Sequence, residues 1–138
     1  MSKGIDLILA DHERVSMLFA RFDETGDATL IGQIVDALVA HDQAEQAALY
    51  PLAGALLGDA DAIERYARQH SAVKKAIEHL EGLEGPPLVE AVDSLRNLVE
   101  EHVGEEEADL LPALTKAASI AQLDGLGARI LQNKQRVG

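Results

Sequence analysis

Two segments of the chain each place a glutamate four residues after a histidine. His41 is followed by Glu45 and His102 by Glu106, so the second pair repeats the first at an offset of 61 residues (from position 41 to position 102). Residues four apart lie on the same face of an α-helix. Because an imidazole and a carboxylate presented from facing helices can bind metal ions, the repeat predicts two related helix pairs, each carrying half of a metal site.

Two more histidines, His12 and His70, fall on the apolar stripes of the two remaining predicted helices. A single histidine on such a stripe is more often a hydrogen-bonded core residue than a ligand. Four histidines with two glutamates are different, because burying so many unpaired polar groups costs on the order of several kcal/mol. The set therefore predicts a metal site. His79, nine residues after His70, lies about half a turn around the helix and is expected to face outward.

Apolar residues at helical spacing predict an all-α protein, an antiparallel up-down-up-down four-helix bundle with a short extra helix at its C-terminal end. We expect one domain over residues 1–138, with the bundle over about 4–118 and an amphipathic segment over 119–138. Turn-forming residues separate the helices, and Pro51 and Pro112 are expected to kink or end theirs. The expected helices span residues 4–23, 28–57, 61–83 and 88–117.

The composition of the 138-residue chain limits its partners. The formal charge of −12 argues against nucleic acid and anionic membrane surfaces, because both would repel the protein. There is no cysteine, which excludes disulfides and thiolate ligands and fits a reducing compartment. The sequence lacks the apolar core of a signal peptide and any apolar run long enough to cross a membrane. We therefore expect a cytoplasmic protein, a monomer or weak homo-oligomer, that binds small molecules.

The predicted donors also limit the metal. Imidazole and carboxylate without thiolate suit iron, manganese or zinc, but six donors exceed what a single zinc ion usually takes. Six donors shared between two ions, with both carboxylates free to bridge, suit a dinuclear iron centre. No histidine has a glutamate three residues before it, so the Glu-x-x-His motif of ferritin-like bundles is absent. The His-Glu-x-x-His motif of zinc proteases is absent as well.

The order of these residues resembles the hemerythrin-like family, also called HHE cation-binding domains, over roughly residues 5–115. The resemblance implies an antiparallel four-helix bundle around two iron ions with an oxo or hydroxo bridge. Both glutamates would bridge the irons, the first two histidines would bind one iron, and the last two histidines would bind the other. The residues that carry the resemblance are His12, His41-x-x-x-Glu45, Pro51, His70, His102-x-x-x-Glu106 and Pro112.

The third predicted helix departs from the oxygen-carrying members of that family, which have His-x-x-x-His there. Here His70 has Tyr66 four residues before it and Lys74 four residues after it. Lys74 is a poor ligand because it is protonated at neutral pH. Tyr66 is either a phenolate ligand to iron or a core residue with a hydrogen-bonded hydroxyl. Near the last pair, Glu105 is either an outer hydrogen-bond acceptor or an extra ligand, and Glu107 is expected to be solvated.

Loss of one imidazole favours redox chemistry over reversible oxygen storage. An anionic ligand in its place stabilises ferric iron and lowers the reduction potential. The sequence thus predicts an oxidoreductase that reacts with hydrogen peroxide, nitric oxide or oxygen, with weak peroxidase or catalase activity or nitric oxide removal, and a role in stress protection. The alternatives are a reversible oxygen or nitric oxide carrier or sensor, an iron-binding protein without turnover, and a bundle that metal merely stabilises.

Overall fold

The computed structural model describes residues 3–137, with side chains described through residue 134. Residues 1, 2 and 138 of the predicted domain lie outside this part. Within it every regular element is helical, and two short π-helical segments, η1 and η2, interrupt the α-helices. The elements are α1 Lys3–Thr25, α2 Thr29–Ala44, η1 Glu45–Leu49, α3 Tyr50–Leu57, α4 Ala60–His79, α5 Gly85–Glu105, η2 Glu106–Leu110, α6 Leu111–Ala117 and α7 Ile120–Val137.

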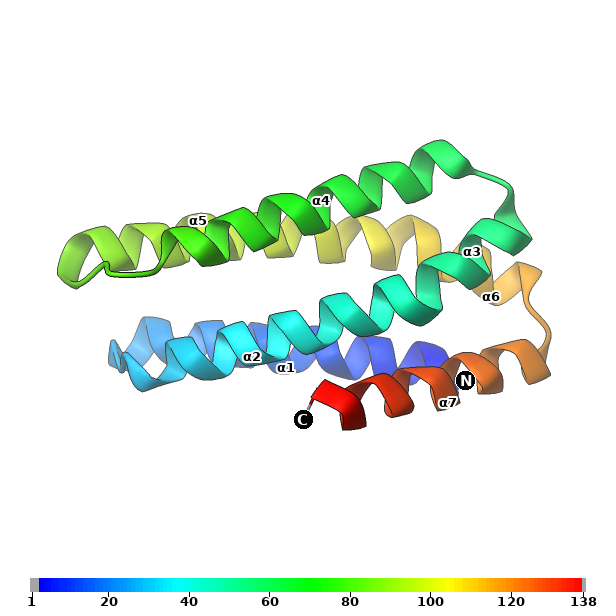
Figure 1. Cartoon of the computed structure of the whole chain (residues 1–138), viewed down its shortest axis with the longest axis horizontal. Coiled ribbons are helices and arrows are strands. Elements are labelled where there is room, and N and C mark those ends of the chain that lie inside the picture. Colours follow the sequence, from blue (N-terminus) through cyan, green and yellow to red (C-terminus); the bar gives the residue numbers. More distant parts are fainter. Residues whose placement is uncertain (1–2, 138) are drawn as a thin grey trace.

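The helices form the expected antiparallel bundle. Helix α1 packs against α2, and α4 packs against α5, with α3 and α6 continuing α2 and α5 at one end (Figure 1). Pro51 and Pro112 lie in the first turn of α3 and α6, directly after η1 and η2, so each proline lacks a backbone N–H at the point where the helical hydrogen-bond pattern changes. The predicted all-α up-down-up-down bundle with an extra C-terminal helix is therefore confirmed.

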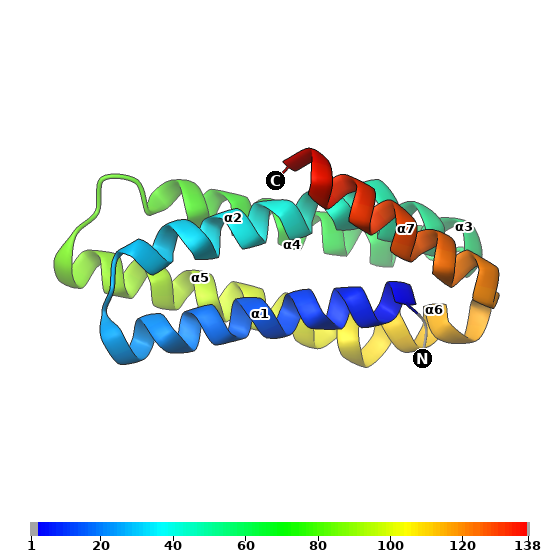
Figure 2. The same cartoon turned by 90° about the horizontal axis from the view of Figure 1, so that it is seen from below.

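The C-terminal helix matches the amphipathic segment predicted over residues 119–138. Helix α7 has 18 residues and packs along α1 and α2 (Figure 2). Its interior glycines lower intrinsic helix propensity, but Gly127 allows a close crossing with Gly4 of α1. A Cβ atom on Gly127 would lie 3.2 Å from the Gly4 nitrogen, and one on Gly4 would lie 2.6 Å from the Leu123 carbonyl oxygen. Close backbone packing thus stabilises a helix that local propensity disfavours.

The turn between α4 and α5 also differs from the prediction. Helix α4 ends at His79 rather than near Leu83, and the chain passes through Gly82, whose φ of 76° favours glycine. Helix α5 begins at Gly85, so Pro86 and Pro87 belong to its first turn instead of the preceding loop. Proline is tolerated there because its φ is already helical and the first turn needs no N–H donor.

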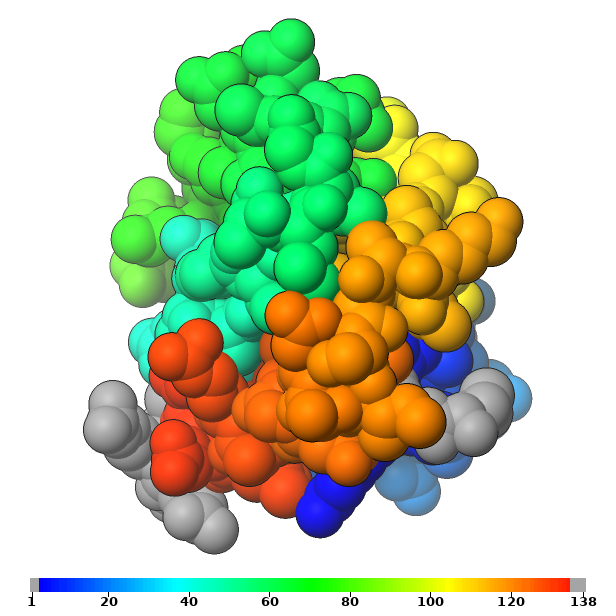
Figure 3. Space-filling view, turned by 90° about the vertical axis from the view of Figure 1, so that its right-hand side faces the viewer, coloured from blue at the N-terminus to red at the C-terminus, as the bar shows by residue number. Residues whose placement is uncertain are grey.

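The bundle interior contains two apolar clusters. One, near the α1–α2 turn, includes Phe19, Ile34 and Leu95. The other includes Leu49 and Leu114 and lies at the opposite end of the bundle. Figure 3 views that end from outside, where α3, α6 and the start of α7 cover it. Hydrophobic burial in both clusters fixes the helix faces that turn inward between them.

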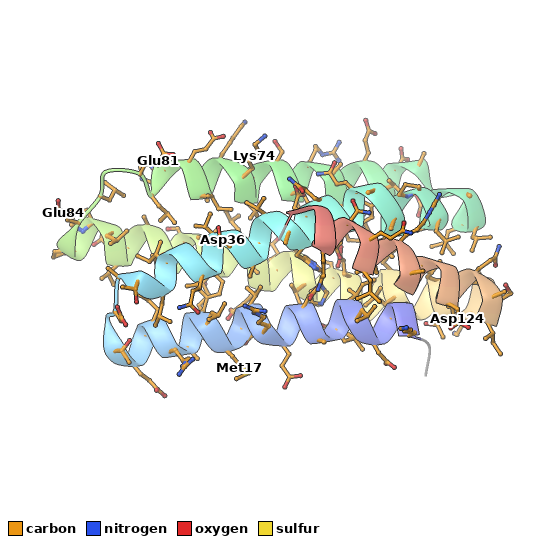
Figure 4. All side chains as sticks on the ribbon, turned by 60° about the horizontal axis from the view of Figure 1, so that its bottom comes forward. Met17, Asp36, Lys74, Glu81, Glu84 and Asp124 are labelled. Atoms are coloured by element: carbon orange, nitrogen blue, oxygen red, sulfur yellow. The ribbon has the colours of Figure 1, made fainter. Side chains whose placement is uncertain are left out.

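The outer surface carries the acidic charge. Glu81, Glu84 and Asp124 project away from the bundle, and Met17 is an exposed apolar side chain on α1 (Figure 4). Among the described residues, no helix combines the length and the apolar character that a membrane crossing requires.

Candidate metal centre

The polar residues buried inside the bundle form one layer between the two apolar clusters. They come from α1, α2, η1, α4, α5 and η2, so each main helix of the bundle supplies at least one. Their relative exposure ranges from 0% for Glu106 to 7% for His41 and His70. The structure brings together all the histidines and glutamates that the repeat and the helical stripes predicted. Within the described residues the buried polar and charged residues are His12, His41, Glu45, His70, His102 and Glu106.

These residues form two groups, each able to hold a metal ion. In each group the potential ligand atoms, one per residue, all lie within 4.8 Å of one another. Both groups contain Glu45 and Glu106, so the two candidate positions share their carboxylates. A shared pair of carboxylates is the arrangement of a dinuclear site. The groups are His12, His41, Glu45 and Glu106, and Glu45, His70, His102 and Glu106.

In the first group the imidazole Nε2 atoms point at the carboxylates and at each other. His41 Nε2 lies 3.1 Å from Glu45 Oε2, and His12 Nε2 lies 3.2 Å from Glu106 Oε1. Neither carboxylate oxygen has a partner with hydrogen-bond geometry. The two Nε2 atoms of His12 and His41 are 3.2 Å apart. Buried oxygens without hydrogen bonds, facing converging imidazole nitrogens, fit a cation placed among them.

The second group is closed by a tyrosine. Nε2 of His70 lies 2.9 Å from Glu45 Oε1, and Nε2 of His102 lies 3.0 Å from Glu106 Oε2. The Tyr50 hydroxyl donates to Glu106 Oε2 at 2.6 Å and also lies 2.6 Å from Nε2 of His70. Burial, and then the charges of Glu45 and Glu106, raise the pKa of Tyr50, so it stays a phenol while no cation lies beside it.

Tyr50 was missed by the sequence analysis, although a signal was present. The second copy of the repeat has Leu111 at the matching position, where the side chain is buried and apolar. Tyr50 has a hydroxyl where Leu111 has an isobutyl group, so this polar contact is present in only one copy of the repeat.

Each imidazole also has an outer partner on its Nδ1 atom. With Nδ1 donating to its outer partner, Nε2 faces the centre and can bind a metal ion once it has lost its own proton. Three of the partners are carboxylates and one is an amide. The outer partners are Glu107 for His12, Asp11 for His41, Asp42 for His70 and Gln69 for His102.

The residues whose roles the sequence left open are now placed. Glu107 is not simply solvated, because it accepts from Nδ1 of His12 at 2.8 Å, although 42% of its side chain is exposed. The side chain of Glu105 accepts from the Gln69 amide, so it supports the outer partner of a histidine. The Tyr66 hydroxyl lies 3.5 Å from the Glu105 carbonyl oxygen, and its ring stacks on Tyr50. Tyr66 therefore occupies a hydrogen-bonded core position.

Two further residues of α4 that the sequence analysis considered, Lys74 and His79, lie outside the centre. Lys74, four residues after His70, is exposed (Figure 4) and lies at the edge of the cavity beside the histidines. His79 is exposed at the end of α4, as its angular distance from His70 predicted.

The two π-helical segments change which helix faces turn inward after the two glutamates. Glu45 begins η1 and Glu106 begins η2, each directly after the α-helix that carries its histidine. A π turn inserts an extra residue into an α-helix and rotates the next helical segment about the axis, and such turns occur frequently at functional sites. The repeat in the sequence therefore corresponds to a repeated distortion of the backbone, with one π turn for each glutamate.

Burial alone would lower the pKa of the imidazoles, but the close approach and negative charge of the neighbouring carboxylates outweigh it. The pKa of His12 is raised to about 10, and those of His41 and His102 to about 9. The pKa of Glu45 is held well below its usual value, because the charge of His41 and hydrogen bonds from the histidines overcome burial. The two carboxylates thus attract protons to the same nitrogens that would bind a metal.

A cavity of about 150 Å³ opens beside the four histidines. Its polar lining, apart from the imidazoles, comes from Asp42, Gln43 and Lys74. The rest is aliphatic, which excludes bulk water and leaves room for a small molecule next to the imidazoles. The aliphatic lining residues are Val15, Leu38, Val39, Val73, Ile77, Val99 and Val103.

Comparison with known proteins agrees with this geometry. The model of the hemerythrin HHE cation-binding domain matches residues 3–114, and the chain belongs to that family. Helix α7 lies beyond the matched residues. A crystal structure of a hemerythrin HHE cation-binding domain-containing protein from Mycobacterium kansasii shares the fold, with a TM-score of 0.86 and 20% sequence identity, over 99% of this chain and 88% of that one.

A second relative, found by sequence similarity, is not described as a hemerythrin-like protein. A protein from Nostoc sp. strain PCC 7120, described as a DNA nickase, is 30% identical over 96% of this chain. This chain spans only 39% of that relative's length.

Proposed function

We propose that this protein is a non-haem di-iron protein whose two irons would both be held by Glu45 and Glu106. The observation that supports this most strongly is that the two candidate metal groups share both glutamates. His12 and His41 would bind one iron, and His70 and His102 the other. Tyr50, rather than Tyr66, would supply the phenolic oxygen, because its hydroxyl lies among the converging donors.

The donor set favours ferric iron. Two carboxylates and a phenol that ionises beside a ferric ion give the centre more negative charge than imidazoles alone would. When bound, the irons would supply one-electron redox chemistry, while the aliphatic cavity would admit only small molecules. We infer an oxidoreductase that disproportionates hydrogen peroxide to water and oxygen, which needs no outside reductant. Nitric oxide is a second candidate substrate.

The acidic charge is a reason to expect small-molecule ligands rather than DNA. A formal charge of −12 repels the phosphate backbone. The nicking activity named for the Nostoc protein is therefore not proposed for the segment that this chain matches.

The apolar cavity favours one alternative, reversible binding of oxygen or nitric oxide without turnover. A small aliphatic cavity next to a metal position suits a diatomic gas at least as well as it suits peroxide. The two functions differ in what remains after exposure to the ligand. A carrier or sensor returns to its starting spectrum when the gas is removed, whereas a peroxide-consuming enzyme destroys its substrate.

The test is the iron content and the ultraviolet–visible spectrum of the purified protein, followed by addition of hydrogen peroxide. We expect about two irons per chain and a loss of peroxide in proportion to protein. Two irons with no peroxide loss, and a reversible band under oxygen or nitric oxide, would favour the carrier or sensor. A protein that binds no iron after anaerobic addition of Fe(II) would refute the di-iron proposal.

Substitutions separate ligands from other histidines. Glu45→Ala and His102→Ala should remove iron or halve the amount bound. His79→Ala is the matched control, because it removes an exposed imidazole from the helix that carries His70. If His79→Ala lost iron as His102→Ala does, the assignment of the centre would be wrong.

A further inference from the structure

A chain of contacts links the C-terminal helix to the candidate metal centre. Lys134 of α7 donates to Asp11 Oδ1, and Asp11 Oδ2 accepts from Nδ1 of His41 at 3.3 Å. Nε2 of the same imidazole lies 3.1 Å from Glu45 Oε2. Each oxygen of Asp11 therefore has a separate partner, one on α7 and one in the centre.

The ion pair between Lys134 and Asp11 is partly shielded from solvent. The Lys134 side chain is 32% exposed and the Asp11 side chain is 15% exposed. Beside them lies a surface hollow of about 550 Å³, which Lys134, Asp11 and His41 line together with Arg14 and Asp36. Without Lys134, the Asp11 carboxylate would have room to rotate into this hollow and hydrate there. The lysine is thus the group that keeps Asp11 turned toward His41.

Packing against the bundle fixes the position of helix α7, which carries Lys134. Its Leu123, Leu126 and Ile130 are buried against the bundle, and Gly127 crosses Gly4 at close range. Lys134 follows Gly127 by seven residues, about two helical turns. The lysine therefore extends from a helix that is already fixed by packing.

The other three outer partners are held differently. Asp42 accepts from Gln46 of the adjoining η1, and Gln69 donates to Glu105. Glu107 has no second side-chain partner among the described contacts. Within the described residues, Asp11 alone of the four is held by a cation. That cation, Lys134, belongs to α7, which lies outside the residues that the family model matches.

We propose that Lys134 is a positioning residue for the metal centre, which orients His41 through Asp11. This inference rests on the proposed function, because its main measurable effect is on metal binding. Outer partners of metal-bound imidazoles typically contribute about 10–100-fold to metal affinity. Since Lys134 acts one step further out, we expect the lower end of that range, and only for the metal position that includes His41.

The experiment compares Lys134→Met with Lys134→Arg and with Lys116→Met. The arginine keeps the cation, and Lys116 is an exposed lysine of α6 whose loss changes the net charge equally. Anaerobic Fe(II) titration against a chelator should show one of the two binding steps weakened about tenfold in Lys134→Met. The other step, and both steps in the two comparison variants, should stay within about twofold of the wild type.

A second measurement does not depend on metal. In the metal-free protein, imidazole nitrogen chemical shifts report whether Nδ1 of His41 donates a hydrogen bond. This signature should be present in the wild type and Lys134→Arg, and altered in Lys134→Met and Asp11→Asn. Unchanged iron binding and an unchanged His41 signal in Lys134→Met would overturn the inference, as would equal weakening of both binding steps. If the wild type binds no iron, the proposed function fails, and the His41 signal still decides the role of Lys134.

Discussion

Tyr50 shows how one side chain can distinguish two otherwise related halves of a centre. Its hydroxyl contacts Glu45, Glu106 and His70, whereas the matching position in the second copy of the repeat is the apolar Leu111. The phenol therefore adds an oxygen donor on one side only. Because a bound ferric ion would strongly favour the phenolate, this asymmetry would stabilise the ferric state more at one of the proposed metal positions than at the other.

Substitution of Tyr50 tests this difference. In Tyr50→Phe, we expect iron to remain bound through the histidines and glutamates, while any phenolate-to-iron absorption band in the visible region disappears. The rate of peroxide loss should fall, because the ferric state loses an anionic ligand. The measurements are the visible spectrum and the rate of hydrogen peroxide loss per iron.

Tyr66→Phe is the matched control for Tyr50→Phe. Its hydroxyl lies 3.5 Å from the Glu105 carbonyl oxygen, whereas that of Tyr50 contacts Glu106 and His70, so the spectrum of Tyr66→Phe should equal that of the wild type. If the band vanished in Tyr66→Phe and persisted in Tyr50→Phe, the assignment of the phenolic donor would be reversed.

The same residue shows what could be predicted from the sequence and what could not. Helical spacing was enough to predict that His41 and Glu45 share a face, since they are four residues apart. Tyr50 follows Glu45 by five residues, which on a regular α-helix is about 140° around the axis. The π turn η1 lies between them and changes that angle. A backbone distortion of this kind depends on the packed bundle, and local propensity does not reveal it.

At the scale of elements, Gly4 of α1 and Gly125 of α7 have opposite surroundings. A Cβ atom on Gly4 would lie 2.6 Å from the Leu123 carbonyl oxygen, and backbone atoms cannot move away as the end of a side chain can. Gly125, also in α7, has no atom within 4 Å of the position that its Cβ would occupy. The amphipathic segment predicted over residues 119–138 contains the whole of α7, but sequence alone does not show which of its glycines serve a close helix crossing.

The two glycines therefore predict opposite changes in stability. We expect Gly4→Ala to lower the free energy of unfolding by about 1–3 kcal/mol, because the new methyl group forces α1 and α7 apart. Gly125→Ala should raise it by about 0.5–1 kcal/mol, because alanine has the higher helix propensity and nothing obstructs its methyl group. Urea denaturation of the metal-free protein measures both. Equal effects of the two substitutions would mean that α1 and α7 do not pack this closely.

At the scale of the whole molecule, protons and metal ions compete for the same buried layer. In the metal-free protein the pKa values of His12, His41 and His102 are raised to about 9–10. A raised pKa stabilises the fold fully below the unfolded value of about 6.5 and loses that contribution as the pH rises through the folded value. Glu45, with a lowered pKa, stabilises the fold above its unfolded value and loses that contribution in acid.

The metal-free protein should therefore be most stable between the unfolded pKa values of glutamate and histidine, from about pH 4.5 to 6.5. Its melting temperature should fall steadily from about pH 6.5 to 10, as the imidazoles lose the protons that pair them with Glu45 and Glu106. With iron bound, the metal replaces those protons, so the melting temperature should stay nearly constant over the same range. Iron binding near pH 7 should release protons, which calorimetry in buffers of different ionisation enthalpy detects. A metal-free melting temperature that rises from pH 6.5 to 10 would show that the buried histidines are neutral in the absence of metal, and that the carboxylates do not draw cations into this layer.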